Sequence, residues 1–233
     1  LTKIRPNNKQ NQLYLTDCPG VLRSEGKRVQ ALNVLAEEEV YGVNSRDQLA
    51  QAYALLQRRI QARWMLEGVT IADPRSTFID SRAKIGTDTI ILPFSYIQGP
   101  CEIGQRCRIG PFAHIRPGTR LEADVEIGAF VEVNRSHLSE GVIARHLAYL
   151  GDAEVGAGAN IGAGAITANF DGTAKHQTTI GAQAMIGAGS VLIAPVSVGA
   201  AATVGAGSVV TKHHDVPAAA VVAGVPARPL EKR

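Results

Sequence analysis

The sequence predicts a mostly β protein, a parallel β-helix of hexapeptide repeats preceded by a long helix and a short α/β segment. Two observations predict this fold class. Aliphatic residues recur at every sixth position over most of the chain, and 24 glycines accompany an aromatic content of only 5% in 233 residues. A period of six fits neither a helix of 3.6 residues per turn nor a strand of period two, and it is typical of hexapeptide β-helices.

The aliphatic positions of the repeat are expected to point into a triangular prism. Three hexapeptides would close one coil, and stacked coils would pair backbone to backbone at about 4.8 Å. Small residues beside each aliphatic position would let the chain turn the corners. The expected inward residues are Ile85, Ile91, Ile97, Ile103, Ile109, Ile115, Leu121, Ile127, Val133, Val155, Ile161, Ile180, Ile186, Leu192, Val198, Val204 and Val210.

The residues before the repeat follow a different pattern. Residues 44–69 lack Gly and Pro until Gly68 and are rich in Ala, Leu, Gln and Arg, so they predict one long helix capped by Asn44 and Ser45. Residues 1–43 are too few to form a core alone and are expected to be the end of another domain. Short β-like runs are expected in them at Leu13–Leu15 and Val29–Val34. The expected division of the chain is 1–46, 47–68 for the linker helix and 69–233 for the β-helix.

Composition and charge argue against several classes of protein. Apolar residues make up 45% of the chain, which argues against disorder, and there is no run of about 18 apolar residues that would predict a membrane span. The formal net charge of +3 is small and the basic residues are scattered, so neither nucleic acid nor a membrane is an expected partner. The three cysteines lack metal-ligand spacing and fit packed thiols of a cytoplasmic protein. The chain starts at Leu1 rather than Met, and we expect it to be a fragment of a longer protein.

The period of six is interrupted at 134–154 and at 168–179. Interruptions of a solenoid are where functional loops tend to leave the coil, so we expect both segments to depart from it. The first contains His146 and Tyr149 close together. Four other histidines are expected to be ordinary corner residues hydrogen-bonded to a neighbouring carbonyl; they are His137, His176, His213 and His214.

Five motifs of the chain resemble a known family. "IGPFAHIRPG", "GAFVEV", "RHLAYLGDAEVG", "NIGAGAIT" and "ANFDG" are similar to the acetyltransferase domain of the bifunctional bacterial N-acetylglucosamine-1-phosphate uridyltransferase/glucosamine-1-phosphate acetyltransferase. "PNNKQNQLYLTD" and "GVNSR" resemble the end of its uridyltransferase domain, which makes 1–46 a nucleotidyltransferase remnant. The resemblance implies a left-handed β-helix and a homotrimer with sites between neighbouring prisms. It also implies acetyl transfer from acetyl-CoA to the amine of glucosamine 1-phosphate, in UDP-N-acetylglucosamine biosynthesis.

The resemblance also assigns the residues that handle the acceptor sugar. An amine must lose a proton before it attacks a thioester, and the family's base, an imidazole with an ordinary pKa near 6.5, falls on His146. The backbone N–H of Ala163 is implied as the donor to the oxyanion, with Gly162 and Gly164 expected to let a ligand approach it closely. The residues implied to bind the sugar and its phosphate are Arg116, Asn134, Tyr149 and Asn160.

A second set of positions is implied to hold acetyl-CoA. Asn169 and Phe170 match a pair in a protruding loop that contacts both ligands, and Ala206 matches a small residue on the CoA path. Ala188 stands where the family has Ser on that path. A basic residue that meets CoA near the C-terminus falls on Gly224, and Lys212 or Arg228 is expected to replace it.

Departures from the family's pattern, these two at the CoA positions and two at the sugar positions, leave the acceptor and the level of activity open. Asn134 replaces the family's second phosphate-binding Lys, and Arg135 beside it is expected to point elsewhere. Phe170 replaces a Tyr. No uridyl transfer is expected, because the residues that cradle its phosphates and Mg²⁺ lie outside this chain. Asn44 matches one Asn of that Mg²⁺ site and cannot form it alone.

Alternative functions remain open at this point. The chain is also compatible with an acetyltransferase for a different amino sugar, or with a weakly active or inactive trimeric scaffold. A third alternative is a zinc carbonic anhydrase on the same coil, which would need three histidines on one metal. Its candidates are His114, His137 and His146.

Overall fold

The computed structural model describes residues 2–6 and 8–230 and divides the chain into two compact units, Leu1–Gln48 and Leu49–Arg233. Unit 1 contains η1 (Leu15–Asp17), α1 (Cys18–Ser24) and η2 (Glu37–Val40). The β-like runs expected at Leu13–Leu15 and Val29–Val34 are wrong, because neither is a strand. A strand needs a partner for its backbone, and here the apolar side chains are exposed as well, to 66% at Leu13 and 79% at Val34.

Helix α2 (Arg46–Leu66) begins with a reciprocal cap. The Gln48 N–H donates to Ser45 Oγ at 3.1 Å, and Gln48 Oε1 accepts from the Asn44 and Ser45 N–H groups at 2.7 and 3.0 Å. Ser45 is therefore the cap that the sequence predicts, whereas Asn44 contributes only its backbone N–H, which donates to Gln48.

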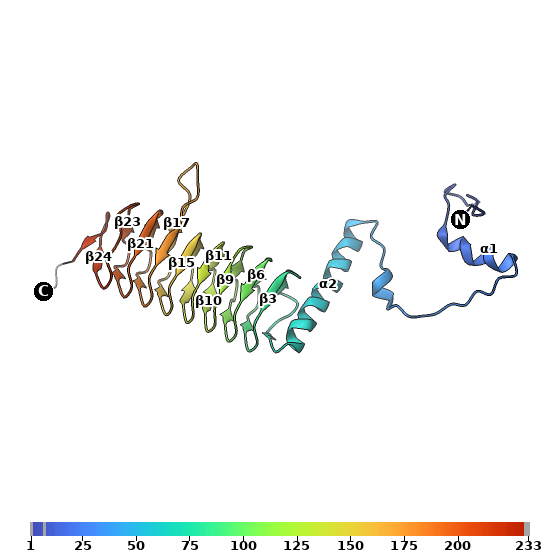
Figure 1. Cartoon of the computed structure of the whole chain (residues 1–233), viewed down its shortest axis with the longest axis horizontal. Helices are drawn as coiled ribbons and strands as arrows, with labels where there is room; N and C mark the ends of the chain where they lie inside the picture. The colour runs from blue at the N-terminus through green and yellow to red at the C-terminus, as the bar shows by residue number, and fades with distance from the viewer. Residues whose placement is uncertain (1, 7, 231–233) are drawn as a thin grey trace. The chain divides into compact units, whose positions relative to one another are not determined.

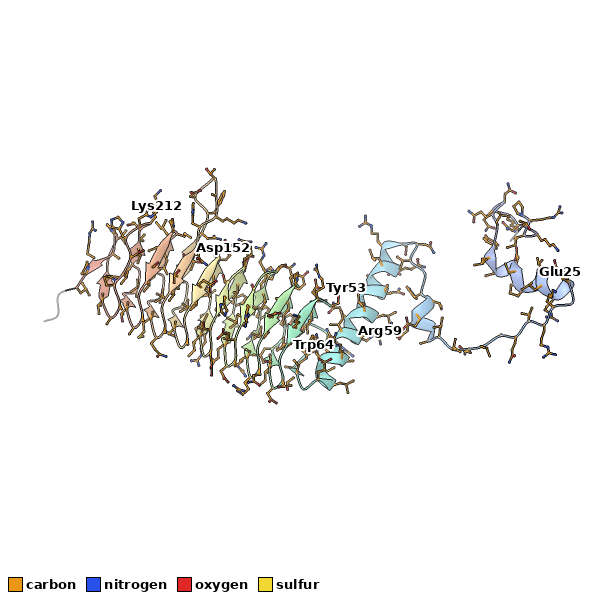
Figure 2. The ribbon with its side chains drawn as sticks, viewed as in Figure 1. Glu25, Tyr53, Arg59, Trp64, Asp152 and Lys212 are labelled. Carbon is orange, nitrogen blue, oxygen red and sulfur yellow. The ribbon has the colours of Figure 1, made fainter. Side chains whose placement is uncertain are left out.

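The C-terminal part of α2 closes the first coil of the prism. Gln57 exchanges two hydrogen bonds of 3.0 Å with the backbone of Ile79, and Gln61 Nε2 donates to the Thr77 carbonyl at 2.6 Å. Trp64 is buried at the end of the helix, against the same coil (Figure 2). An open sheet edge would expose unpaired backbone groups, so the two glutamines act as a polar cap of the solenoid.

Three parallel sheets form the sides of the prism (Figure 1). Sheet A contains β1 (Thr70–Ile71), β4 (Ile90–Ile91), β7 (Arg108–Ile109), β10 (Glu126–Ala129), β13 (Ile143–His146), β16 (Asn160–Ile161), β19 (Met185–Ile186), β22 (Thr203–Val204), β24 (Val221–Ala223) and the antiparallel β25 (Arg228–Pro229). Sheet B contains β2 (Phe78–Ile79), β5 (Tyr96–Ile97), β8 (His114–Ile115), β11 (Glu132–Asn134), β14 (Tyr149–Gly151), β17 (Ile166–Ala168), β20 (Val191–Ile193) and β23 (Val209–Val210). Sheet C contains β3 (Ala83–Ile85), β6 (Cys101–Ile103), β9 (Arg120–Leu121), β12 (His137–Leu138), β15 (Ala153–Val155), β18 (Thr178–Ile180) and β21 (Val196–Val198).

The hexapeptide repeat and its inward positions are confirmed. Every aliphatic residue predicted to point inward is buried, from Ile85 at 7% exposed to Ile109 at 0%. They stack in register from coil to coil, as in the pairing of Ile91 with Ile109 and of Ile109 with Ile127. The core is therefore a set of continuous aliphatic ladders along the prism.

The first expected departure from the coil is wrong. Residues 134–154 stay in the prism, with Leu138, Ala144 and Leu150 in inward positions. The period is broken because steps of five residues, Val133 to Leu138 and Leu150 to Val155, each shorten one corner. A shortened corner moves no backbone out of the coil, so the broken period is not an insertion there.

The second expected departure is confirmed. After β17 the chain leaves the prism as a protruding loop and returns at β18 (Figure 1). The loop is held by a bridge between Phe170 and Lys175, and Asp171 accepts hydrogen bonds from two loop N–H groups and from His176. These bonds hold the pKa of Asp171 well below its usual range.

Within the described residues, no helix is long and apolar enough to cross a membrane. Of the cysteines, Cys101 and Cys107 are buried free thiols, as expected of packed residues, and Cys18 is half-buried. Burial raises the pKa of Cys101 to about 12, which keeps its thiol protonated and unreactive.

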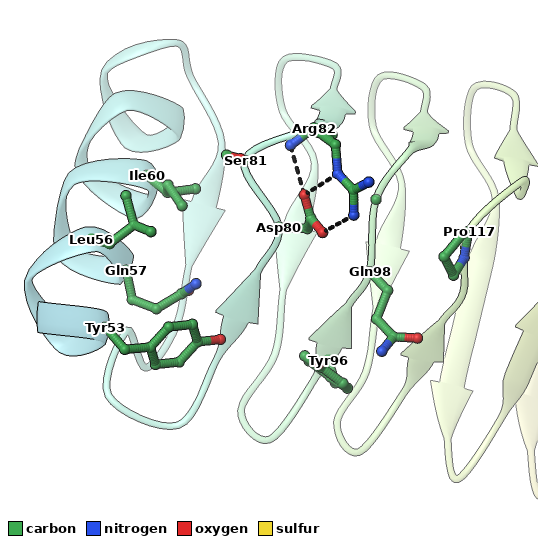
Figure 3. Close-up of a pocket in the computed structure, with 11 residues that line it drawn as sticks. Tyr53, Leu56, Gln57, Ile60, Asp80, Ser81, Arg82, Tyr96, Gln98 and Pro117 are labelled. Atoms are coloured by element: carbon green, nitrogen blue, oxygen red, sulfur yellow. Dashed lines mark hydrogen bonds and ion pairs between the residues drawn. The ribbon is translucent and has the colours of Figure 1, made fainter. Parts of the chain in front are cut away.

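A cavity of about 410 Å³ lies where α2 meets the first coils, lined by Tyr53, Gln57 and Gln98 among others (Figure 3). Its rim carries a two-point ion pair between Arg82 and Asp80, with Nε–Oδ1 and Nη2–Oδ2 distances of 3.0 and 2.7 Å. The hydrogen bonds from Arg82 lower the pKa of Asp80 to about 2.

The Asp80 ion pair should contribute to stability only above acidic pH. Because the pKa of Asp80 is about 2 in the folded chain and ordinarily 3.8, its contribution is complete above the higher value and is lost as the pH falls through the lower one. We expect Asp80→Asn to lower the free energy of unfolding by about 1 kcal/mol or less at pH 6 and by clearly less at pH 2. Denaturant unfolding at both pH values measures this; a difference that does not change with pH contradicts it.

Candidate functional site

His146 ends strand β13 at the corner between sheets A and B, with its side chain exposed outside the prism. Its backbone pairs with Ala129 in the preceding coil, and its carbonyl accepts from the Gly164 N–H at 3.2 Å. Within the described residues, the imidazole makes no hydrogen bond or ion pair. Both ring nitrogens are therefore available to a ligand.

Ala163, Ala188 and Ala206 form a column along the same corner, continuing from His146. The carbonyls of Ala163 and Ala188 accept from Gly189 and Gly207 at 2.7 and 2.8 Å, which fixes the stacking. The side chains are exposed or half-buried. We call these three residues the alanine column. The column has small side chains along a prism edge and leaves room for an extended ligand beside it.

The backbone N–H groups of the alanine column are available as donors. Gly162 and Gly164 each donate to a neighbouring coil, at 2.7 and 3.2 Å, but among the described residues the Ala163 N–H donates to no other group. The same holds for the N–H groups of Ala188 and Ala206 within that range. A ligand at this edge would therefore meet a row of preorganised donors.

A groove of about 210 Å³ lies on the other side of His146. Arg108, Glu126 and Arg145 line it, and Arg145 grips Glu126 through Nε–Oε2 and Nη2–Oε1 bonds of 2.7 and 3.1 Å. The hydrogen bonds from Arg145 hold the pKa of Glu126 below its usual range. The groove thus carries two guanidinium groups and one carboxylate beside the imidazole.

Arg116 and Asn134 lie at the opposite edge of sheet B, at its corner with sheet C. They are stacked, because the Arg116 N–H donates to Val133 and the strands of the two coils pair in register. Arg116 Nη1 donates to Glu132 Oε1 at 2.8 Å, while its Nε is buried without a partner in the described chain. An unpartnered buried donor is unfavourable and indicates a place for an acceptor.

The expectation that Arg135 points away from Asn134 is wrong. Arg135 Nη1 donates to Asn134 Oδ1 at 3.0 Å, and its Nε and Nη2 grip Asp152 at 2.7 and 2.8 Å. Asp152 also accepts a hydrogen bond from Asn169. The sequence analysis missed Asp152. The two shortened corners could have indicated it, because they place Arg135 and Asp152 at equivalent positions of successive coils. Both residues have a φ of 49°.

Tyr149 starts β14 on the outer face of sheet B, between the two edges, in register with Glu132 and Ile166. Its hydroxyl leans over Gly151, where an added Cβ would lie 2.5 Å from it and 2.8 Å from Asn169 Nδ2. Gly151 therefore makes room for Tyr149 and Asn169 to meet. The exposed ring of Phe170 follows Asn169 in the protruding loop.

The remaining residues that the family resemblance implies lie at other places in the fold. Asn160 is on the outer face of sheet A, in register with Ile143, and is not brought to the sheet B face. Arg228 pairs with Ala223 in the last coil of sheet A, so it lies near the end of the alanine column. Lys212 lies beyond β23 on the side of the protruding loop (Figure 2). Of the two expected replacements, Arg228 is therefore the one beside the column. Asn44 lies in unit 1, where its backbone N–H donates to Gln48 Oε1.

The three histidines of the zinc alternative lie on three different faces of one prism. His114 is in sheet B, His137 in sheet C and His146 in sheet A. Within the described range, no three His, Cys, Asp or Glu side chains are grouped to hold a metal. The ring nitrogens of His137 contact Glu122 and Glu154 at 2.9 and 3.1 Å.

The remaining histidine expectations are mixed. His214 contacts the Lys212 carbonyl at 3.0 Å, as expected of a corner residue. His137 and His176 are paired with carboxylates instead of carbonyls. His137 meets carboxylates of the two neighbouring coils, and His176 meets Asp171 of its own loop.

The expected reason for Gly162 is corrected. A Cβ at Gly162 would lie 2.6 Å from both Ala188 N and Ile186 O, so the next coil, rather than a ligand, requires this glycine. Gly164 has a φ of +72°, a left-handed conformation that favours glycine at the corner.

Gly162→Ala should destabilise the prism. We expect a loss of about 1–3 kcal/mol in the free energy of unfolding, because the added methyl overpacks a backbone that cannot move independently. Gly42→Ala is the matched control, since nothing lies within 4 Å of a Cβ there. Denaturant unfolding of both variants tests this, and equal stability of the two would show that the coils can separate to admit a methyl group.

Comparison with known proteins now identifies the class of the chain. The family described as "Bacterial transferase hexapeptide (six repeats)" matches residues 82–113, 103–135 and 177–212. The chain thus carries the hexapeptide repeats of this family, as its β-helix fold indicates.

More particularly, the chain is related to the bifunctional protein GlmU. It is 43% identical to that of Heliobacterium modesticaldum over 85% of this chain and 50% of the relative. The protein of Pelobacter propionicus is 42% identical over 82% of this chain and 49% of the relative. That of Mycobacterium bovis is 41% identical over 85% of this chain and 47% of the relative. The chain spans about half the length of the curated relatives it matches. The family resemblance of the sequence motifs is confirmed.

A likeness to solved structures is also found. PerB from Caulobacter crescentus, in complex with CoA and GDP-perosamine, is 22% identical, covers 91% of this chain and 90% of that chain, and has a TM-score of 0.44.

Proposed function

We propose that the chain transfers an acetyl group from acetyl-CoA to the amine of glucosamine 1-phosphate, a step toward UDP-N-acetylglucosamine. The observation that carries this proposal is the position of His146, an exposed and unpartnered imidazole at the head of the alanine column. The relation to bifunctional GlmU over most of the chain supports it.

His146 is the general base of the proposed reaction. It removes a proton from the ammonium of the acceptor, and the free amine attacks the thioester carbon of acetyl-CoA. The N–H of Ala163, which has no partner among the described residues, donates to the oxygen that becomes negative. The attacking nitrogen then carries an extra proton; collapse of the intermediate expels the CoA thiolate, which takes up that proton and leaves the neutral amide.

The acceptor sugar is proposed to lie across the outer face of sheet B. Gly151 is in register with Asn134, and the corner at Leu147 and strand β14 separate it from His146. His146 and Arg116 lie at the two edges of this face, and Tyr149 lies between them. The amine therefore meets the imidazole while the phosphate meets Arg116.

Acetyl-CoA is proposed to follow the alanine column, with its thioester at Ala163. The free N–H groups of Ala188 and Ala206 suit the carbonyls of its extended arm. Arg228, near the end of the column, suits its phosphates. Asn169 and Phe170 in the protruding loop, and Lys212 on the same side, are proposed as further contacts.

A homotrimer is proposed as the assembly that completes the sites. An exposed apolar ridge runs along the corner that bears His146: the rings of Phe94, Phe112 and Phe130 stack with centroids 4.8 and 5.0 Å apart, and Leu147 follows. Contiguous exposed apolar residues of this kind mark association surfaces. A neighbouring copy on this ridge would cover the sheet B face and exclude water from it.

Removing the His146 imidazole should abolish acetyl transfer without unfolding the chain. We expect His146→Ala to lower kcat by about 10²- to 10⁴-fold, the usual contribution of a general base. The measurement is thiol release from acetyl-CoA with glucosamine 1-phosphate, compared with unphosphorylated glucosamine.

His137→Ala is the matched control, because that imidazole lies on sheet C. It should retain activity. Equal losses in the two variants would refute the role of His146, and no activity of the unaltered chain on either sugar would favour the scaffold alternative or another acceptor.

A further inference from the structure

A polar cluster at the corner of sheets B and C comprises Arg116, Asn134, Arg135, Asp152 and Asn169. Arg135 is its centre. Its left-handed backbone, with φ 49°, turns the side chain back along the coil edge. Its Cγ lies only 3.2 Å from where a Cβ of Gly118 would be, so the absence of a side chain at Gly118 gives it space. The corner itself therefore aims the guanidinium at the sheet B edge.

Arg135 fixes the orientation of the Asn134 amide. A guanidinium has only donors, so the atom of Asn134 that faces it at 3.0 Å must be the carbonyl oxygen. The amide NH₂ then points away from Arg135. Asn134 is 4% exposed, and among the described residues its Nδ2 makes no hydrogen bond. Two N–H donors are thus held in a fixed direction without an acceptor.

The balance of donors and acceptors in the cluster defines its ligand. The carboxylates are engaged: Glu132 accepts from Arg116, and Asp152 from Arg135 and Asn169. Three groups of the cluster offer unused donors, two of them on guanidinium groups: Arg116 Nε, the second hydrogen of Arg135 Nη1 and Asn134 Nδ2. A phosphate monoester has oxygens that accept several hydrogen bonds, whereas a sugar hydroxyl needs at least one acceptor for its own proton.

We propose that Arg135 is the second cation for the phosphate of the acceptor and orients Asn134 toward it, an inference that rests on the proposed function. Arg135 and Asn134 together form a donor group beside Arg116. Asp152 accepts hydrogen bonds from Nε and Nη2 of Arg135, which leaves Nη1 to donate to Asn134 and to the phosphate. The hydrogen bond from Arg135 also lowers the pKa of Asp152, so the carboxylate is ionised and the ion pair is present at neutral pH.

The test compares Arg135→Ala with Arg106→Ala. Arg106 grips Asp124 with the same two-point geometry, at 2.8 and 2.7 Å, and also has a left-handed backbone, but it follows sheet C at another corner. We expect Arg135→Ala to raise the Kd and KM for glucosamine 1-phosphate by about tenfold or more, with kcat and the KM for acetyl-CoA changed less than about threefold. Arg106→Ala should change none of them.

Two further variants sharpen the result. Arg135→Gln keeps hydrogen-bond donors at the corner without the charge, and it should also weaken binding of glucosamine 1-phosphate, which covers the case in which Arg135→Ala fails to fold. Asn134→Lys placed in the Arg135→Ala chain returns a cation to the cluster and should recover most of the lost affinity. Calorimetric titration gives Kd, and circular dichroism confirms that each variant is folded.

Three outcomes would overturn the assignment: equal weakening by Arg106→Ala, equal weakening of phosphorylated and unphosphorylated glucosamine, or no recovery in a folded double variant. The proposed function fails separately. If the unaltered chain binds glucosamine 1-phosphate in an Arg135-dependent way but transfers no acetyl group, the anion site stands and the transferase does not.

Discussion

Parallel backbone pairing between successive coils is the constraint on which the rest of the structure depends. Each coil repeats the corner of the coil before it, so residues one coil apart in the sequence lie side by side. His146 lies between Ala129 and Ala163 for this reason, and Arg116 lies against Asn134. Close stacking also forces glycine where backbones nearly touch; at Gly128 an added Cβ would fall 1.9 Å from the Arg145 carbonyl oxygen.

The periodic part of the fold was predictable from the sequence because its cause is local. An aliphatic residue every sixth position has one favourable place, the prism interior, and every predicted one is buried there. The β-like runs at Leu13–Leu15 and Val29–Val34 failed because strand propensity without a pairing partner does not make a strand. The departure predicted at 134–154 was wrong because a deletion and an insertion both interrupt the period of six. The spacing of five residues between Val133 and Leu138 indicates a deletion.

The sequence motifs suggested residues for the candidate site, but they did not show how those residues are arranged. Motifs named His146 and Arg116, yet only the register shows that they flank the same face of sheet B from opposite edges. The direction of a side chain at a corner depends on the backbone conformation there. The left-handed conformation of Arg135 could not be predicted from the sequence. For that reason its contact with Asn134 came only from the structure. The zinc alternative failed because the register places its three histidines in three different sheets of the prism.

The central claim is that coil register builds a CoA track from the alanine column, and CoA binding to two tryptophan variants tests it directly. Ala188→Trp fills the track, while Ala182→Trp places the same bulk at the exposed corner between sheets C and A. Calorimetric titration with CoA should show the Kd raised by about tenfold or more in the first variant and changed by less than about twofold in the second. Equal affinities in the two variants would contradict the account.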